Sequence, residues 1–210
     1  MPTTYDHTLA GGHAVLDFVN SVDDWTAPAD DYLREFGDAV RFASAVGLIT
    51  RREAQSLEGA RSRSGATELA ALRGLRASLE RVLRAWLARE RAPAPDLTVL
   101  RDNLMEAMGG TRLAPGGDRP LAREIPVESN GPAVVRFRIA ESAIALLASD
   151  QVSRVKACPT CGWFFLDVSK NQSRVWCSMD TCGARAKARR YYRRTRRRSS
   201  PAARPPKRQP

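Results

Sequence analysis

The four cysteines of this chain, Cys158, Cys161, Cys177 and Cys182, lie within one short stretch at the spacing C-x2-C-x15-C-x4-C. Two cysteine pairs separated by enough residues for a β-hairpin are typical of a structural Zn²⁺ site. Gly162 directly follows the first pair, where a residue with positive φ closes a tight turn and lets both sulfurs face one ion. Four thiolates would leave no open coordination position, so we expect the ion to stabilise the fold and not to act as a Lewis acid.

A pair of disulfides is the alternative use of four cysteines. The N-terminus lacks the basic and apolar regions of a secretory signal, so we expect a reducing, cytoplasmic environment, which favours metal over oxidation. So small a module buries little apolar surface, and zinc binding to comparable peptides contributes on the order of 10 to 16 kcal/mol. We therefore expect this region to unfold without metal.

The residues between the cysteine pairs predict a hairpin. The aromatic run 163–166 suits a strand, 167–173 is a polar turn, and 174–176 predicts a returning strand. Ser178 is placed to N-cap a helix that carries Cys182 near its first turn. A knuckle, a hairpin and a helix around one ion predict a small treble-clef-like zinc finger. Its core would consist of Trp163, Phe165 and Trp176.

This stretch resembles the CGNR zinc finger proteins, whose pattern is close to CGWxFxDxSxNxSRxWCxMxxCGNRxK. The matching positions are Cys161, Gly162, Trp163, Phe165, Asp167, Ser169, Asn171, Ser173, Arg174, Trp176, Cys177, Met179, Cys182, Gly183, Arg185 and Lys187. Ala184 stands where the family has the Asn of its name, so the contact that this amide makes in relatives is absent here. Residues 11–21, GGHAVLDFVNS, resemble the opening of the helical ABATE domain found ahead of such fingers. The resemblance implies a bacterial cytoplasmic protein that regulates transcription.

Positive charge is concentrated at one end of the chain. Residues 151–210 contain 16 Lys and Arg against 2 Asp and Glu, a net charge of +14, whereas residues 1–150 carry a net charge of −3. Such segregation indicates a polyanionic partner for the C-terminal part and a separate role for the rest. The sequence contains no apolar window of about 18 residues, so we expect no contact with a membrane.

Residues 1–150 predict a mainly α domain with minor β structure. Apolar residues recur every three or four positions over 31–48, 69–87 and 96–108, which predicts three amphipathic helices. We expect the second of them to form the core, with Arg76 on its outer face. Thr50-Arg-Arg-Glu is a capping box that opens a further short helix, ending near residue 60. The helix over 96–108 is expected to bury Leu97, Leu100, Leu104 and Met108.

The part of the chain before the finger carries mixed signals. Residues 111–132 hold seven Gly and Pro, with β-prone pieces at 112–113 and 122–125, which predicts a loose hairpin. Residues 134–139 predict a strand and 140–149 a helix. Because the connection that follows is short, we expect the finger to pack on the helical domain. The resulting division is a helical domain at 1–150, a finger with a basic helix at 151–198, and a disordered basic tail at 199–210.

Two features of the N-terminal domain invite a ligand-binding interpretation. Asp17 and Asn20 lie one helical turn apart and could contact a ligand, although structural hydrogen bonds are the simpler interpretation. Trp86 and the methionines of 96–108 could line a pocket for a small-molecule effector, although an apolar stripe at helical spacing usually packs in a core. The unpaired His7 and His13 are taken as inert. Self-association of this domain would make a homodimer.

The basic helix after Cys182 predicts nucleic-acid binding. Most of its cations would contact phosphates, which gives affinity that depends on salt and not on sequence. The candidates for base contacts are Lys170, Asn171 and Arg174 at the hairpin tip and Arg185 and Lys187 early in the helix. The candidates for phosphate contacts are Arg189, Arg190, Arg193 and Arg194.

DNA is favoured as the partner because the finger would present its helix beside a rigid core, as modules that enter a DNA groove do. The alternative is an RNA-binding or protein-interaction adaptor with a structural zinc finger. The sequence contains no phosphate-cradling Gly loop, no His-x-Glu partner to the cysteines and no nucleophile elbow. We therefore expect no enzymatic activity.

Overall fold

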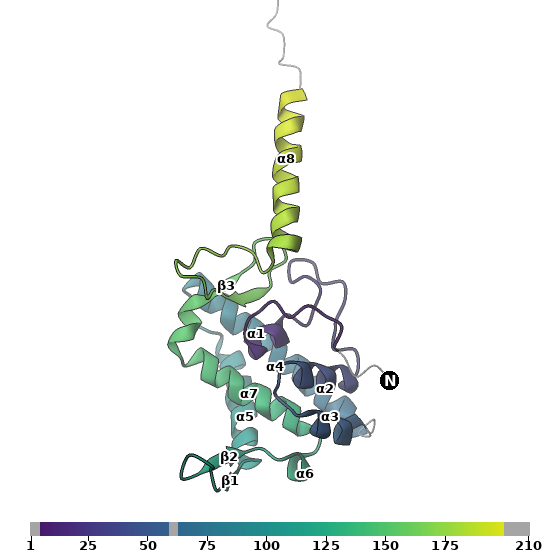
Figure 1. Cartoon of the computed structure of the whole chain (residues 1–210), viewed down its shortest axis with the longest axis vertical. Helices are drawn as coiled ribbons and strands as arrows, with labels where there is room; N and C mark the ends of the chain where they lie inside the picture. The colour runs from purple at the N-terminus through teal and green to yellow at the C-terminus, as the bar shows by residue number, and fades with distance from the viewer. Residues whose placement is uncertain (1–4, 59–62, 200–210) are drawn as a thin grey trace, which may run out of the picture.

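The computed structural model describes residues 5–58 and 63–199, and shows a helical body from which one long helix projects (Figure 1). The predicted class, mainly α with minor β and a four-cysteine finger, is confirmed. The body consists of α1 (Ala14–Val19), α2 (Phe36–Ala45), α3 (Arg51–Glu58), α4 (Arg63–Ala88), α5 (Ala94–Gly109), β1 (Arg112–Ala114), β2 (Ala122–Glu124), α6 (Val127–Asn130) and α7 (Ala133–Leu147). The finger region consists of η1 (Asp150–Arg154), β3 (Val155–Ala157), β4 (Phe164–Leu166), η2 (Met179–Gly183) and α8 (Ala184–Ser199).

The core of the body is built around α4, as its apolar spacing predicts. Leu72, Leu75, Leu79 and Leu83 are all 0% exposed, which places one face of α4 entirely inside the molecule. This face packs against α1, α2, α5 and α7. Burying four leucines stabilises the fold by several kcal/mol in total, at about 1.5 to 3 kcal/mol each.

Arg76 does not lie on the outer face of α4, so that prediction is wrong. The residue is only 6% exposed, and its guanidinium donates hydrogen bonds of 2.5 and 2.8 Å to the carboxylate of Asp31 and of 2.9 Å to the carbonyl of Ser21. A buried guanidinium is tolerated because these acceptors replace water. Arg76 therefore ties α4 to the loop that precedes α2.

That loop also changes the expected start of the second helix. A helix was predicted from residue 31, but α2 begins at Phe36, because Asp31 forms a β-bridge with Val22 and the N–H of Tyr32 donates to the carbonyl of Ser21. Leu33 is nevertheless fully buried. Residues 21–35 thus form a loop that the Val22–Asp31 bridge closes and that Arg76 ties to α4.

The strand predicted over residues 134–139 is instead the first half of α7. The β-branched and aromatic residues of this segment suggested a strand, yet the two arginines among them, Arg136 and Arg138, find partners inside the helical fold. Arg136 donates to Glu68, Glu106 and Asn103, and Arg138 to Glu53 and two carbonyls. Tertiary contacts therefore override the local β-propensity of the valines.

Two local predictions in the body are confirmed. Thr50 and Glu53 make the reciprocal capping box of α3, with the N–H of Thr50 donating to Glu53 at 2.7 Å and the N–H of Glu53 donating to the Thr50 hydroxyl at 3.2 Å. The predicted hairpin within 111–132 is the antiparallel pair β1 and β2, with Leu113 opposite Arg123.

The expected burial of α5 is only partly correct. Leu100 is buried and Leu104 half-buried, but Leu97 is 47% and Met108 54% exposed. The apolar stripe of this helix therefore extends beyond the surface that α4 and α7 cover. Within residues 5–58 and 63–199, none of the helices combines the length and the apolar character that crossing a membrane requires.

The finger does not fold around a core of its own alone, because part of it is buried in the core of the body. Strand β4 pairs antiparallel with β3 and alternates its side chains between two clusters. Phe164 and Leu166 face the core of the body, while Phe165 faces the cysteines. The finger thus packs tightly on the helical domain, as the short connection predicts. The tail residues 200–210, expected to be disordered, lie outside the described residues.

Candidate metal centre and nucleic-acid interface

The first cysteine pair lies in the tight turn between β3 and β4. The N–H of Gly162 donates to the carbonyl of Cys158 at 2.9 Å, and Gly162 has a φ of +72°. A side chain at this position would be strained, and its Cβ would lie 2.9 Å from the Cβ of Trp25. The predicted role of Gly162 in closing the knuckle is confirmed.

The second cysteine pair lies directly before the basic helix. The hydroxyl of Ser178 accepts from the N–H of Thr181 at 3.3 Å, which confirms its predicted N-cap role. The turn that it caps, η2, is a π-helical turn that carries Cys182 and continues directly into α8. Ala184, which stands where the CGNR pattern has Asn, is the first residue of α8 and is exposed.

The four sulfurs converge on one point. All four lie within 4.8 Å of one another, with 3.6 Å between those of Cys161 and Cys177 and 3.7 Å between those of Cys177 and Cys182. Tetrahedral zinc with sulfurs about 2.3 Å away requires sulfur–sulfur separations of about 3.8 Å, whereas a disulfide is about 2.0 Å long. All four cysteines are free and buried. The group therefore fits one structural zinc ion bound by four thiolates.

The backbone favours the ionised form of the first ligand. Burial opposes ionisation of Cys158, but the N–H groups of Cys177, Thr160 and Cys161 point at its sulfur, and together they lower the pKa of this thiol to about 7. A thiolate is the form that binds metal. The other sulfur of the knuckle behaves differently, because its contact with the Cys177 sulfur and its burial raise the pKa of the Cys161 thiol well above its usual range.

The returning strand predicted over residues 174–176 is absent from the described structure, because the partner of β4 is β3. Residues 167–174 form a loop around the carboxylate of Asp167, which is fully buried. This carboxylate accepts from the ammonium of Lys156 at 2.7 Å, from the hydroxyl of Ser169 at 2.6 Å and from the N–H of Arg174 at 3.0 Å. Burial alone would raise the pKa of Asp167, but these hydrogen bonds outweigh it and hold the pKa well below its usual range. The Asp-x-Ser motif therefore has a structural role.

Arg174 is also occupied within the fold, so its assignment to base contacts requires correction. Its guanidinium donates to the carbonyls of Ala10, Trp176 and Cys177 and lies 4.5 Å from the ring centroid of Phe165. Little donor capacity remains for a base. Arg174 instead ties the N-terminal segment to the metal centre.

Asp17 and Asn20 make structural contacts beneath the finger. The amide of Asn20 donates to the carbonyl of Phe164 and accepts from its N–H, both at 2.8 Å, and so pairs with β4 as a neighbouring strand would. Asp17 accepts from the N–H of Gly11 at 2.7 Å, while the carbonyl of Gly11 accepts from the N–H of Leu166. Asp17 and Asn20 are 7% and 3% exposed, which leaves no surface for a ligand.

Two residues that hold the finger on the body carry no sequence signal. Arg84 of α4 donates to the carbonyl of Gly162 at 2.8 Å and lies over the ring of Phe164. Trp25 donates its backbone N–H to the carbonyl of Cys161 at 2.9 Å. Neither belongs to a recognisable motif, since each acts on a segment more than 70 residues away in sequence.

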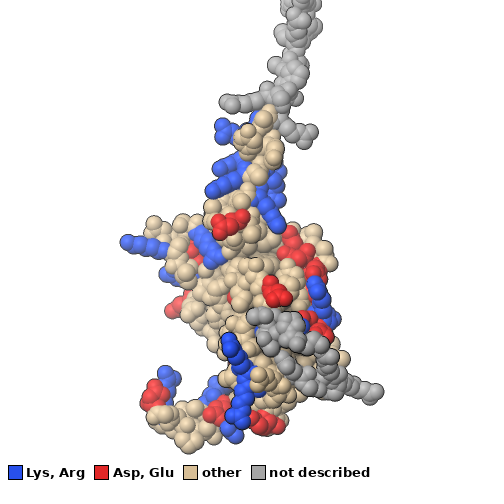
Figure 2. Space-filling model, turned by 45° about the vertical axis from the view of Figure 1, so that its right-hand side comes forward, with Lys and Arg blue, Asp and Glu red and all other residues tan. Residues whose placement is uncertain are grey.

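The candidate nucleic-acid contacts form an exposed basic surface. Figure 2 shows Lys and Arg side chains along α8, and Figure 1 shows that this helix projects away from the body. The only hydrogen bond from these side chains among the described residues joins Arg189 to the hydroxyl of Thr160 at 3.2 Å. The exposed members of this surface are Lys170, Asn171, Arg185, Lys187, Arg189, Arg190, Arg193 and Arg194.

The fold and the cysteine cluster define a helical domain joined to a structural zinc finger with a basic helix. Residues 12–150 match the sequence model of the ABATE family, described as "Putative stress-induced transcription regulator", and residues 154–195 match that of the CGNR zinc finger. The chain therefore belongs to the ABATE family and carries a CGNR zinc finger, in the order that the resemblance implied. No match was found among curated proteins.

Proposed function

We propose that this protein regulates transcription by binding double-stranded DNA through α8. The observation that carries the proposal is that the described cations of this helix have no acidic partner. Six basic side chains on the described part of α8 are exposed, the helix contains no acidic residue, and none of the six is paired with a carboxylate. Cations without protein partners are available to phosphates.

The shape of the helix supports this assignment. An α-helix with its side chains is about 10 to 12 Å across, which the DNA major groove, about 12 Å wide, can admit, and the 16 residues of α8 give it a length of about 24 Å. At 100° per residue the six cations cover somewhat more than half of the helix circumference. The remaining face carries Ala184, Ala188, Tyr191, Tyr192 and Thr195. One side of α8 can therefore face phosphates while the other stays uncharged.

The zinc ion has a structural role in the proposal. Bound by Cys158, Cys161, Cys177 and Cys182, it would fix η2, from which α8 starts, against the knuckle and the body. Zinc held by four thiolates has no vacant position for a substrate, so the proposal includes no catalytic step.

Affinity and sequence preference would come from different residues. Each phosphate contact contributes about 0.9 to the slope of log K against log salt, so the six described cations allow a slope of up to about −5. Base contacts would come from Lys170 and Asn171 on the exposed loop or from Arg185 and Lys187 near the first turn of α8. Without such contacts the protein would bind any duplex.

A selection of bound duplexes from random DNA tests the proposal. The zinc-loaded protein is used at about 150 mM salt, where phosphate contacts alone are weakened. The proposal predicts an enriched motif, and it predicts loss of binding when Arg190, Arg193 and Arg194 are changed together to Ala. A matched control changes Arg51, Arg52 and Arg91 to Ala, because these are exposed arginines of the body and give the same change in charge. Equal loss in both triple variants would show that net charge alone is responsible.

A second candidate function is favoured by the two tyrosines. Tyr191 and Tyr192 are 67% and 66% exposed, and unpaired bases stack on exposed aromatic rings. An RNA-binding adaptor would therefore bind structured RNA with single-stranded loops more tightly than duplex DNA. It would lose that preference when both tyrosines are changed to Ala, whereas duplex binding through phosphates would change little.

A further inference from the structure

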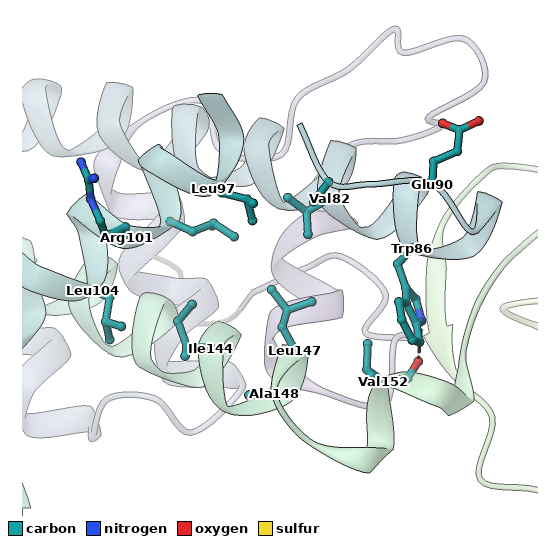
Figure 3. A pocket seen from close by; sticks show the side chains of 12 residues that line it. Val82, Trp86, Glu90, Leu97, Arg101, Leu104, Ile144, Leu147, Ala148 and Val152 are labelled. Atoms are coloured by element: carbon teal, nitrogen blue, oxygen red, sulfur yellow. Dashed lines mark hydrogen bonds between the residues drawn. The ribbon is translucent and has the colours of Figure 1, made fainter. Parts of the chain in front are cut away.

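An open apolar groove of about 460 Å³ lies on the body, and no described residue of α8 is among those that line it (Figure 3). Its walls come from the C-terminal end of α4, from α5, from the end of α7 and from η1. The volume falls within the range of about 300 to 1,000 Å³ that is typical of small-molecule sites. The lining residues are Val82, Trp86, Glu90, Ala92, Leu97, Leu100, Arg101, Leu104, Ile144, Leu147, Ala148 and Val152.

Large apolar side chains in this groove face solvent. Trp86 is 48% and Leu97 is 47% exposed, and Ile144 and Leu147 are only half-buried. Covering them would remove apolar surface from water, at about 25 cal/mol per Å². Trp86 and the methionines of α5 were candidates for lining a pocket, but Met105 and Met108 are not among the residues that line this groove.

Polar side chains are few in the groove, and their positions make its two ends different in charge. The indole N–H of Trp86 already donates to the carbonyl of Val152 at 3.2 Å. Arg101 and Glu90 lie toward opposite ends of the view in Figure 3. Among the residues that the structure describes, the guanidinium of Arg101 hydrogen-bonds only the adjacent carboxylate of Asp102. Both side chains are more than half exposed, so this ion pair is weak and a ligand can replace it.

We propose that this groove binds an elongated, mostly apolar molecule that carries one carboxylate. The apolar part would lie along Leu97, Leu104 and Leu147 and cover the face of Trp86. The carboxylate would accept hydrogen bonds from Arg101, whose forked donors match two oxygens, and would avoid Glu90 at the other end.

The groove also touches the segment that leads to the finger. Val152 lies in η1, which continues into β3 and then into the knuckle at Cys158. The indole of Trp86 holds this segment through its hydrogen bond to Val152. A ligand that covers Trp86 and shifts its ring would weaken this hydrogen bond and so loosen the segment that leads to the zinc centre. This consequence for DNA binding rests on the proposed function, whereas the ligand site does not.

The test is a titration of the zinc-loaded full-length protein with octanoate, followed through the indole N–H signals of its tryptophans in ¹H–¹⁵N spectra. Trp86→Phe identifies the signal of Trp86. The proposal predicts that this signal shifts in a saturable way, while the indole of Trp25, which donates to the carbonyl of Val19, responds less. No saturable shift of the Trp86 signal would overturn the proposal.

Two variants locate the ligand, and both are surface changes. Ala148→Phe places a ring in the groove and should abolish octanoate binding. Arg101→Gln should weaken octanoate about tenfold and leave 1-octanol unchanged, because only a charge-assisted hydrogen bond is lost. The matched control is Arg91→Gln, an exposed arginine outside the lining.

Three outcomes would contradict the assignment. Octanoate that binds equally well to Ala148→Phe occupies another site. Tighter binding of octylammonium than of octanoate would place the charged end at Glu90. A Trp86 signal that shifts with protein concentration in the absence of ligand, and no longer does so in Ala148→Phe, would show that a second copy of the chain covers the groove.

Discussion

Helices α4 and α8 are both rich in arginine, but they use it in opposite ways. In α4, four arginines each hydrogen-bond a carbonyl or carboxylate of another segment, and these are Arg73, Arg76, Arg81 and Arg84. Among the described arginine side chains of α8, only Arg189 hydrogen-bonds another segment, and its partner is the hydroxyl of Thr160. Helix α4 is covered by other elements, whereas the element that α8 chiefly contacts is η2.

The difference shows how to separate structural from functional charge in this protein. A guanidinium that lies among protein acceptors stabilises the fold, and removing it leaves a carboxylate or carbonyl without its partner. A guanidinium in water contributes little to folding and remains available to a polyanion. Substitution of an arginine in α4 should therefore lower stability more than nucleic-acid affinity, and substitution of an arginine in α8 should do the reverse.

The largest effect is expected for Cys177→Ser. This change removes a zinc ligand next to the start of α8 and leaves the packing of α4 intact. Loss of one thiolate abolishes tight zinc binding, which contributes on the order of 10 kcal/mol in small fingers. We expect no bound zinc by elemental analysis and no detectable duplex binding, with most of the helical circular dichroism of the body retained. Val175→Ala, an exposed residue close by, should retain both properties. Full DNA affinity in the cysteine variant would show that the basic residues act without the finger.

The next effect is expected for Arg76→Ala in α4. This change leaves the carboxylate of Asp31 and the carbonyl of Ser21 without their donor, and we expect it to destabilise folding by about 3 kcal/mol in urea unfolding. Affinity for DNA should not change where the variant is folded. Arg73→Ala is the matched control and should cost less, because Arg73 is 42% exposed. Equal losses for the two variants would contradict the distinction between buried and exposed arginines.

A smaller effect concerns Glu53, the partner of Arg138. The hydrogen bond from Arg138 lowers the pKa of Glu53 from 4.5 to about 2, against the opposing effect of burial. A lowered folded-state pKa adds stability above the unfolded-state pKa, and this stability, about 2 kcal/mol, is lost as pH falls from about 4.5 to 2. Other carboxylates titrate in the same window, so the measurement is the difference between the native protein and Glu53→Gln. The native protein should lose more stability between pH 5 and pH 2, and parallel curves would show that the pair contributes nothing to the acid response.

The smallest effect on stability, close to zero, is expected for the double change Arg190→Ala and Arg194→Ala in α8. Both side chains are exposed, so the free energy of unfolding should change by less than about 0.5 kcal/mol. Duplex affinity should fall about tenfold for all sequences, and the slope of log K against log salt should become shallower by about 2. A destabilised variant with unchanged affinity would reverse the roles assigned to the two helices.

The metal centre was predictable because its signals are local. Cysteine spacing, the glycine after Cys161 and the N-cap at Ser178 each act within a few residues, and all three appear in the structure as predicted. The same holds for the capping box of α3 and the leucine stripe of α4. Short-range geometry and burial periodicity do not depend on distant partners.

The errors occur where a distant partner decides. The β-branched and aromatic residues of 134–139 predicted a strand, but Arg136 and Arg138 are paired with glutamates from α3, α4 and α5. The returning strand predicted for the finger hairpin does not form among the described residues. One edge of β4 pairs with β3, and its other edge hydrogen-bonds Asn20, which lies about 140 residues away in sequence. Local propensity contains no information about such partners.

The sequence by itself determined the zinc ligands, the mainly helical class and the segregation of positive charge to one end, since each follows from the spacing or composition of nearby residues. Only the tertiary structure decided which arginines are structural. Arg76, Arg84 and Arg174 are engaged inside the fold, whereas the described arginine side chains of α8 are exposed. The physical reason is that all these side chains carry the same charge, and only the acceptors brought near them by folding distinguish a buried, paired guanidinium from one that remains in water.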